Sequence, residues 1–99
     1  MNIQLVNKGT EAEVLLEGHL DSAVAPEASK ALMDIASRFE SLTLNLENLE
    51  YTASAGLRIF RNLYIAMDKK GGNFYIKNVK PTVMEVFEMT GFASFLHFI

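Results

Sequence analysis

The sequence predicts an α/β fold in which a mixed sheet of about four to five strands carries helices packed on it. Two kinds of segment alternate along the chain. In one, apolar and polar residues alternate as in a strand, and in the other, apolar residues recur at helical spacing. This order implies parallel strand pairs joined by right-handed crossovers. With 99 residues, 49% of them hydrophobic, the chain can form one core, so residues 1–99 are expected to be a single domain.

The first 39 residues predict a hairpin followed by a helix. Residues 3–8 and 14–16 carry the weak alternation and the apolar run of two strands joined by a polar turn. Residues 18–21 break this pattern, and small or apolar residues recur at helical spacing from residue 25 to residue 39. Either of two residues can provide the start signal of this helix: Asp21 or Ser22.

The remainder of the chain alternates strands with helices. Leu42, Leu44 and Leu46 alternate with polar residues, which is typical of a strand with one apolar face. The tail is too apolar to remain in solvent, so we expect it to pack on the sheet or to form a last edge strand. The predicted elements are a strand from 42 to about 49, a helix from about 55 to 67, a strand at 74–76, a short helix at 83–87 and the tail at 92–99.

Composition excludes several classes of function. The net charge is −3 and the nine lysines and arginines are scattered, which argues against nucleic acid as a partner. Without cysteine there are no disulfides, thiol nucleophiles or thiolate metal sites. No apolar run approaches the ~18 residues of a membrane span and no signal peptide is visible, so we expect no membrane insertion and a cytoplasmic location.

Candidate catalytic groups are sparse. Only His19 and His97 could serve as neutral bases near pH 7, and they are far apart in the sequence. Pairs of nearby carboxylates have simpler roles at a helix start or a strand end. The sequence contains neither metal-ligand spacing nor a glycine-rich phosphate loop. We therefore expect a protein that is not an enzyme and that holds no metal or cofactor.

One junction is unusual, the stretch YTASAGLR between a predicted strand and helix, with five small residues from Thr52 to Gly56. Ser54 falls at or beside the helix N-cap, where its hydroxyl can accept a free backbone N–H. Gly56 in a first helical turn costs about 0.5–1 kcal/mol relative to alanine and lets another backbone or a ligand approach closely. Since a helix N-terminus also favours anions, the junction predicts an exposed contact site.

Two arginines extend this site along the helix. Arg58 and Arg61 lie four and seven residues after Ser54, which places the three residues on one side of a helix. A phosphate on Ser54 can therefore meet Arg58 in a charge-assisted hydrogen bond. Without phosphate, the arginines can face an acidic partner, or they can simply belong to a solvated helix face.

Three features occur in order along the chain: Gly18-His19-Leu20-Asp21 followed by Ala25-Pro26-Glu27; Leu44-Asn45-Leu46 running into Tyr51 and Ser54-Ala55-Gly56-Leu57-Arg58; and Gly71-Gly72 before Phe74-Tyr75-Ile76. In this order and spacing they resemble the STAS domain family, and specifically its bacterial anti-sigma-factor antagonists. The resemblance covers essentially the whole chain and implies a small single-domain STAS-like fold.

The resemblance also implies a phosphorylation-gated binding module. In that family the unphosphorylated protein binds an anti-sigma factor with a histidine-kinase-like ATPase domain. The kinase phosphorylates a serine at the start of the second helix, and a PP2C-type phosphatase removes the phosphate. Ser54 is the best match to that serine and Thr52 is the second candidate. The partner-binding residues implied are Asp21, Thr52, Ala53, Ser54, Ala55, Gly56, Arg58 and Arg61.

The match to the family's phosphorylation motif differs at two positions. The commonest signature, D-S-S-G-L, has its acceptor serine directly before the glycine, where this chain has Ala55, and its aspartate where this chain has Ala53. A second version, resembling S-S-A-G-L-R, has a serine where Ser54 stands, and this chain fits it except that Ala53 replaces its first serine. The two alanines support an alternative function, a constitutive STAS subunit of an assembly, such as an ABC lipid-transporter component or a regulator of a PP2C-type phosphatase.

Overall fold

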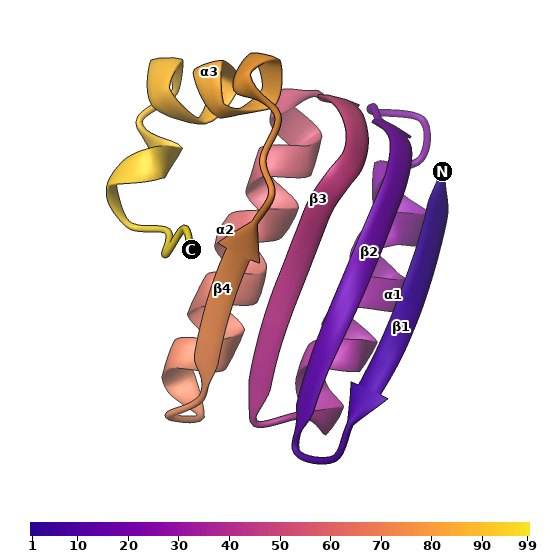
Figure 1. Cartoon of the computed structure of the whole chain (residues 1–99), viewed down its shortest axis with the longest axis vertical. Coiled ribbons are helices and arrows are strands. Elements are labelled where there is room, and N and C mark those ends of the chain that lie inside the picture. The colour runs from indigo at the N-terminus through magenta and orange to yellow at the C-terminus, as the bar shows by residue number, and fades with distance from the viewer.

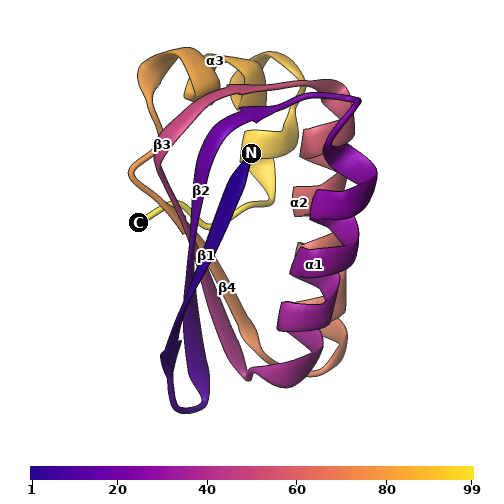
Figure 2. The ribbon, with the colours of Figure 1, turned by 90° about the vertical axis from the view of Figure 1, so that its right-hand side faces the viewer.

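The computed structural model describes residues 1–99 as a four-stranded sheet with two long helices on one face and a shorter helix at one end (Figures 1 and 2). This arrangement confirms the predicted α/β class and the mixed sheet. In chain order the elements are β1 (Asn2–Lys8), β2 (Glu11–Leu20), α1 (Ala25–Arg38), β3 (Ser41–Thr52), α2 (Ser54–Lys69), β4 (Asn73–Lys77), α3 (Pro81–Met89) and a short 3-10 helix (Phe92–Ser94).

The strands lie in the order β1-β2-β3-β4, so β1 and β4 form the two edges. β1 and β2 are an antiparallel hairpin, whereas β2–β3 and β3–β4 are parallel pairs connected through α1 and α2. The hairpin turn has only two residues, Gly9 and Thr10, and Gly9 has a φ of 84°. A positive φ at the first central position is typical of a type II′ turn, which glycine adopts without steric cost.

The core lies between the sheet and the two long helices. Leu42, Leu44 and Leu46 are fully buried, as their alternation predicts, and they face the helical layer. Leu32 of α1 and Phe60 of α2 are also completely buried in this layer. Each large apolar side chain buried here contributes about 1.5–3 kcal/mol relative to its exposed state.

Two strands extend further than predicted. Residues 18–21 were expected to break the strand pattern, but β2 continues to Leu20, and β3 continues past Leu49 to Thr52. The two strands pair over this extension, with Leu20 opposite Thr52, after register shifts near Leu15 and Gly18. Gly18 adopts a φ of 107°, a backbone conformation that glycine tolerates, so the strand continues through the irregularity.

The C-terminal tail packs along the outer edge of β4. Ile76 donates its N–H to the His97 carbonyl and accepts the Ile99 N–H, both at 2.9 Å. Phe98 stacks edge-on against Phe87 of α3, with ring centroids 5.3 Å apart. The expected packing on the sheet is confirmed, but the alternative of a last edge strand is wrong because pairing stops at a single bridge between Ile76 and Phe98.

None of the helices combines the length and the apolar character that crossing a membrane requires.

Candidate functional site at the start of α2

The structure brings two loops together at one end of the sheet, the end drawn at the top of Figure 1. The N–H of Ala53, which links β3 to α2, donates to the carbonyl of Leu20 at the end of β2, with an N···O distance of 2.9 Å. Asp21 directly follows Leu20. Asp21 and Ser54, 33 positions apart in the sequence, are therefore both carried at this end because β2 and β3 are parallel neighbours.

Ser54 is the first residue of α2 and its side chain is exposed. The N-cap is Ala53, which has an extended backbone (φ −89°, ψ 174°), and no side chain accepts a hydrogen bond from the first turn. The expectation that the Ser54 hydroxyl caps the helix is therefore wrong. A hydroxyl that is exposed and not engaged in capping is available to other molecules.

The electrostatic environment of this helix end favours negative charge. The Ala53 carbonyl accepts the N–H groups of Gly56 and Leu57, at 2.9 and 3.2 Å, and the first turn contains no acidic residue. Arg58 and Arg61 are exposed and make no ion pair within the chain. The helix dipole and the two arginines therefore both create positive potential on the side of α2 that carries Ser54.

Gly56 has a different role from the one expected. We predicted that its missing side chain would leave room for a partner, but Gly56 is buried and a Cβ at this position would overlap the Thr52 hydroxyl and the Leu20 side chain. The glycine therefore allows α2 to pack closely against the ends of β2 and β3. Its contribution to a binding surface is indirect, through the position of the helix end.

The other candidates differ in accessibility. Thr52 is only 2% exposed and its hydroxyl lies 3.2 Å from the Ala53 carbonyl, to which it donates. Ala53 and Ala55 are half-buried. Asp21 is also half-buried, and one of its carboxylate oxygens accepts the N–H groups of Ala23 and Val24 at 3.0 and 3.1 Å. Asp21 thereby shapes the turn that leads into α1, which begins at Ala25.

One exposed residue at this end was not among the predicted contacts. The Tyr51 side chain is 47% exposed and lies beside His19 of β2, with ring centroids 6.2 Å apart. The predicted strand ended near Leu49, so its alternation did not reach this residue. In the structure β3 continues to Thr52, which faces inward, and Tyr51 before it therefore faces outward. Figure 1 shows α3 near the same end, where Lys80 forms a 3.4 Å ion pair with Glu50.

A polar network lies on the opposite face of the sheet from the helices. Glu13 of β2 accepts hydrogen bonds from Lys8, Asn45 and Lys77, each at 3.1 Å, so that residues of all four strands meet. Burial opposes ionisation of this carboxyl, but the hydrogen bonds from Lys77, Asn45 and Lys8 outweigh it and lower the pKa of Glu13 to about 2. The network fixes the strands that carry the junction.

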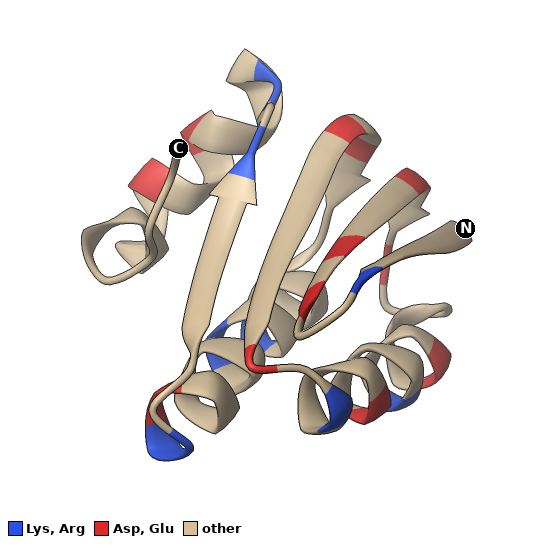
Figure 3. Cartoon of the chain, turned by 60° about the horizontal axis from the view of Figure 1, so that its bottom comes forward, with Lys and Arg blue, Asp and Glu red and all other residues tan.

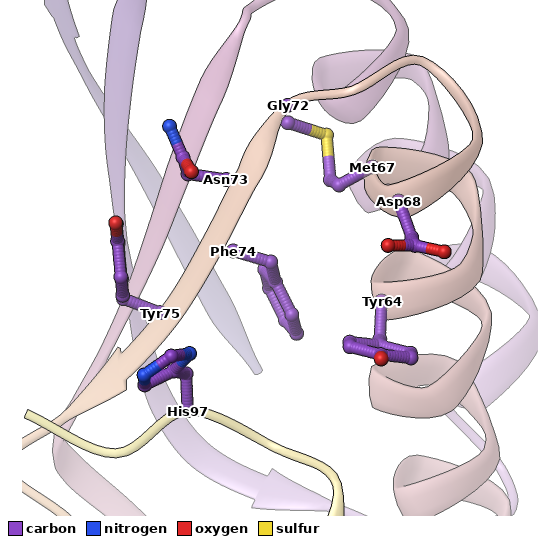
Figure 4. Close-up of a pocket in the computed structure, with 8 residues that line it drawn as sticks. All are labelled: Tyr64, Met67, Asp68, Gly72, Asn73, Phe74, Tyr75 and His97. Carbon is purple, nitrogen blue, oxygen red and sulfur yellow. The ribbon is translucent and has the colours of Figure 1, made fainter.

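A small hollow of about 240 Å³ lies between α2 and β4 (Figure 4). Its walls include Tyr64 and Asp68 of α2, Phe74 of β4 and His97 of the tail. Apart from His97, these residues belong to the C-terminal half of α2 and the first half of β4, whereas Ser54 begins α2. The hollow is therefore distinct from the junction.

Comparison with known proteins identifies the fold. A family model for the STAS domain matches residues 2–99. The anti-sigma-B factor antagonist of Staphylococcus epidermidis is 28% identical over 98 residues, which cover 98% of this chain and 91% of that protein. The structure of the unphosphorylated anti-sigma factor antagonist SpoIIAA superposes with a TM-score of 0.84 at 19% identity, covering 99% of this chain and 88% of SpoIIAA. SpoIIAA from Bacillus in its phosphorylated form gives a TM-score of 0.76 at 18% identity, with coverages of 99% and 91%.

Proposed function

We propose that this chain, which belongs to the STAS domain family, is an anti-sigma-factor antagonist whose binding is switched by phosphorylation of Ser54. The observation that carries the proposal is an exposed serine at an uncapped helix N-terminus, followed by two arginines without ion-pair partners. The protein acts by binding, and it is not an enzyme. Relatives named anti-sigma-B factor antagonists, aligned over nearly the whole chain, support this class of function.

Phosphorylation would change the surface without disturbing the fold. A phosphate adds about −1.5 to −2 charges, and the free N–H groups at the start of α2 accept that charge favourably. Arg58, one helical turn further along, can donate to the phosphate oxygens. The modified surface then has a different shape and charge, so a partner that contacts the unmodified helix end is released.

Ser54 is a better acceptor than Thr52 for a steric reason. The Ser54 side chain is exposed, whereas Thr52 is 2% exposed and packs against Gly56. A kinase could reach the Thr52 hydroxyl only after the end of β3 had separated from α2. We therefore assign the switch to Ser54.

The partners follow from this function. The unphosphorylated form binds an anti-sigma factor with a histidine-kinase-like ATPase domain, and a PP2C-type phosphatase restores the unphosphorylated form. An anti-sigma factor acts on a sigma factor, so the setting is the cytoplasm. The contact surface consists of the exposed part of the junction, including Ser54, Arg58, Arg61 and Tyr51.

The test is phosphate transfer from ATP by the purified anti-sigma factor kinase of the same organism, with mass spectrometry locating the modified residue. Phosphate on Ser54 in the wild type and none in Ser54→Ala is the expected result. Ser54→Asp should bind the kinase at least tenfold more weakly, while Ser37→Asp, an exposed serine near the far end of α1, should bind as the wild type does. Equal binding of Ser54→Asp and wild type would exclude the switch at this residue.

A second function fits the two alanines that flank Ser54. Ala55 occupies the place of the acceptor serine in the commonest family motif, which favours a constitutive STAS subunit without phosphorylation. Such a subunit would serve an ABC lipid transporter or a PP2C-type phosphatase. Absence of any phosphate transfer, together with stable binding to one of these assemblies, would support this function over the first.

A further inference from the structure

β1 is an edge strand that lacks the features which usually prevent such an edge from pairing with another strand. It pairs with β2 on one side only and runs for seven residues in unbroken register. It contains no proline, and its single charged residue, Lys8, is engaged with Glu13. The other edge of the sheet is different, because the tail bonds to Ile76 of β4. Unprotected edge strands are templates for pairing with another strand.

The hairpin determines which backbone groups point outward from β1. Lys8 and Glu11 flank the two-residue turn and therefore form a hydrogen-bonded pair. Such pairs alternate along an antiparallel ladder, so Gln4 and Val6 also bond to β2. The N–H and C=O groups of Ile3, Leu5 and Asn7 then face the open edge. This set is symmetric about Leu5.

The helical layer is incomplete beside this edge. An apolar groove of about 290 Å³ lies between β1 and α1 and is lined by Ile3, Val24, Ala28 and Ala31 among others. Ile3 and Leu5 are only half-buried on the helix side. Figure 2 views the sheet from this side, with β1 as the nearest strand and α1 running beside it in the same direction. Ile3 lines the groove together with Val24, Ala28 and Ala31, so Leu5, two residues further along β1, lies towards the middle of α1.

The outer face of α1 carries alternating charges. Glu27, Lys30 and Asp34 surround the exposed Ala31, and Arg38 follows one turn after Asp34, to which it makes an exposed 3.4 Å ion pair. Figure 3 shows the resulting sequence of red and blue bands along α1. When this face meets an antiparallel copy of itself, Glu27 approaches Arg38 of the copy and Lys30 approaches Asp34 of the copy. Both pairings bring opposite charges together.

We propose that two copies of this chain associate through antiparallel pairing of their β1 strands, with the two-fold axis at Leu5. The backbone of Ile3 in each copy then forms hydrogen bonds with Asn7 of the other copy, and Leu5 pairs with Leu5. The outward N–H and C=O groups of all three residues are thereby hydrogen-bonded. The two sheets become one of eight strands and the α1 helices lie side by side. Because the pairing is antiparallel, the two Ser54 ends point in opposite directions and each remains free to bind a partner.

The chain lacks cysteine, which makes a cross-linking test direct. Two residues in a hydrogen-bonded antiparallel pair have Cα atoms about 5.5 Å apart, within the range of a disulfide. Leu5→Cys is therefore expected to form a covalent dimer under mild oxidation, whereas Glu88→Cys, exposed on α3, is not. Thermal melting monitored by circular dichroism checks that both variants fold.

Sedimentation of the unmodified chain provides the second measurement. We expect a concentration-dependent dimer at micromolar to high micromolar concentrations. Glu27→Arg or Arg38→Glu alone should weaken it by up to about tenfold, since each ion pair occurs twice in a two-fold interface, and the double variant should restore it. A chain that sediments as a monomer throughout this range, or a Leu5→Cys variant that cross-links no more than Glu88→Cys, would overturn the proposal.

Discussion

Replacing Glu13 by glutamine is expected to destabilise the protein in a pH-dependent way. The pKa of this carboxyl falls from 4.5 to about 2 on folding, because its hydrogen bonds to Lys77, Asn45 and Lys8 outweigh the cost of burial. At ~1.4 kcal/mol per pH unit this difference corresponds to about 3 kcal/mol of folding free energy. The Glu13 side chain is 14% exposed, but those of Lys8 and Lys77 are 51% and 32% exposed, so solvent screening makes this value an upper limit.

The sign of the pH dependence follows from the lowered pKa. The ionised carboxylate stabilises the folded state, so the contribution is complete above the unfolded pKa of 4.5 and is lost as the pH falls towards 2. Urea unfolding of wild type and Glu13→Gln should therefore differ by up to about 3 kcal/mol near pH 7 and converge in acid. A gap that stays constant with pH, or a Glu13 carboxyl that titrates near 4.5 by NMR, would refute the reasoning.

Three further predictions concern the start of α2. Gly56→Ala should lower the free energy of unfolding by about 1–3 kcal/mol despite the better helix propensity of alanine, because its Cβ would overlap the Thr52 hydroxyl and Leu20. Adding Thr52→Ala should recover part of that loss in urea unfolding; a more stable Gly56→Ala would contradict the packing argument. Ala53→Ser should raise the stability by about 0.5–2 kcal/mol, since it supplies the missing N-cap acceptor, and an unchanged melting temperature would argue against the uncapped helix. Ser54→Asp should leave thermal stability unchanged or raise it by about 0.3–1 kcal/mol through the helix dipole, and a marked loss would mean that Ser54 has a structural role.

Local patterns were sufficient for much of the fold. The alternation of Leu42, Leu44 and Leu46 predicted the central strand, and helical spacing predicted α1 from its first residue, Ala25. Ser54 was located at the start of α2 from the same kind of pattern. Periodicity works here because burial of one face of a strand or helix depends on neighbours within the same segment.

Contacts between distant segments decided the rest. β2 continues past Gly18 and β3 continues past Leu49 because the two strands pair with each other. The role of Gly56 depends on Leu20 and Thr52, which surround it only in the folded chain. The same holds for Glu13, whose pKa is set by residues from three other strands.

The sequence by itself thus determined the class of fold, the order of its elements and the position of an exposed serine at a helix start. Only the tertiary structure decided that Ala53 rather than Ser54 is the cap, that Gly56 serves close packing, and that the edge of β1 is open. The physical reason is that hydrophobic periodicity is encoded residue by residue, whereas steric fit, hydrogen-bond partners and free strand edges depend on the register between elements.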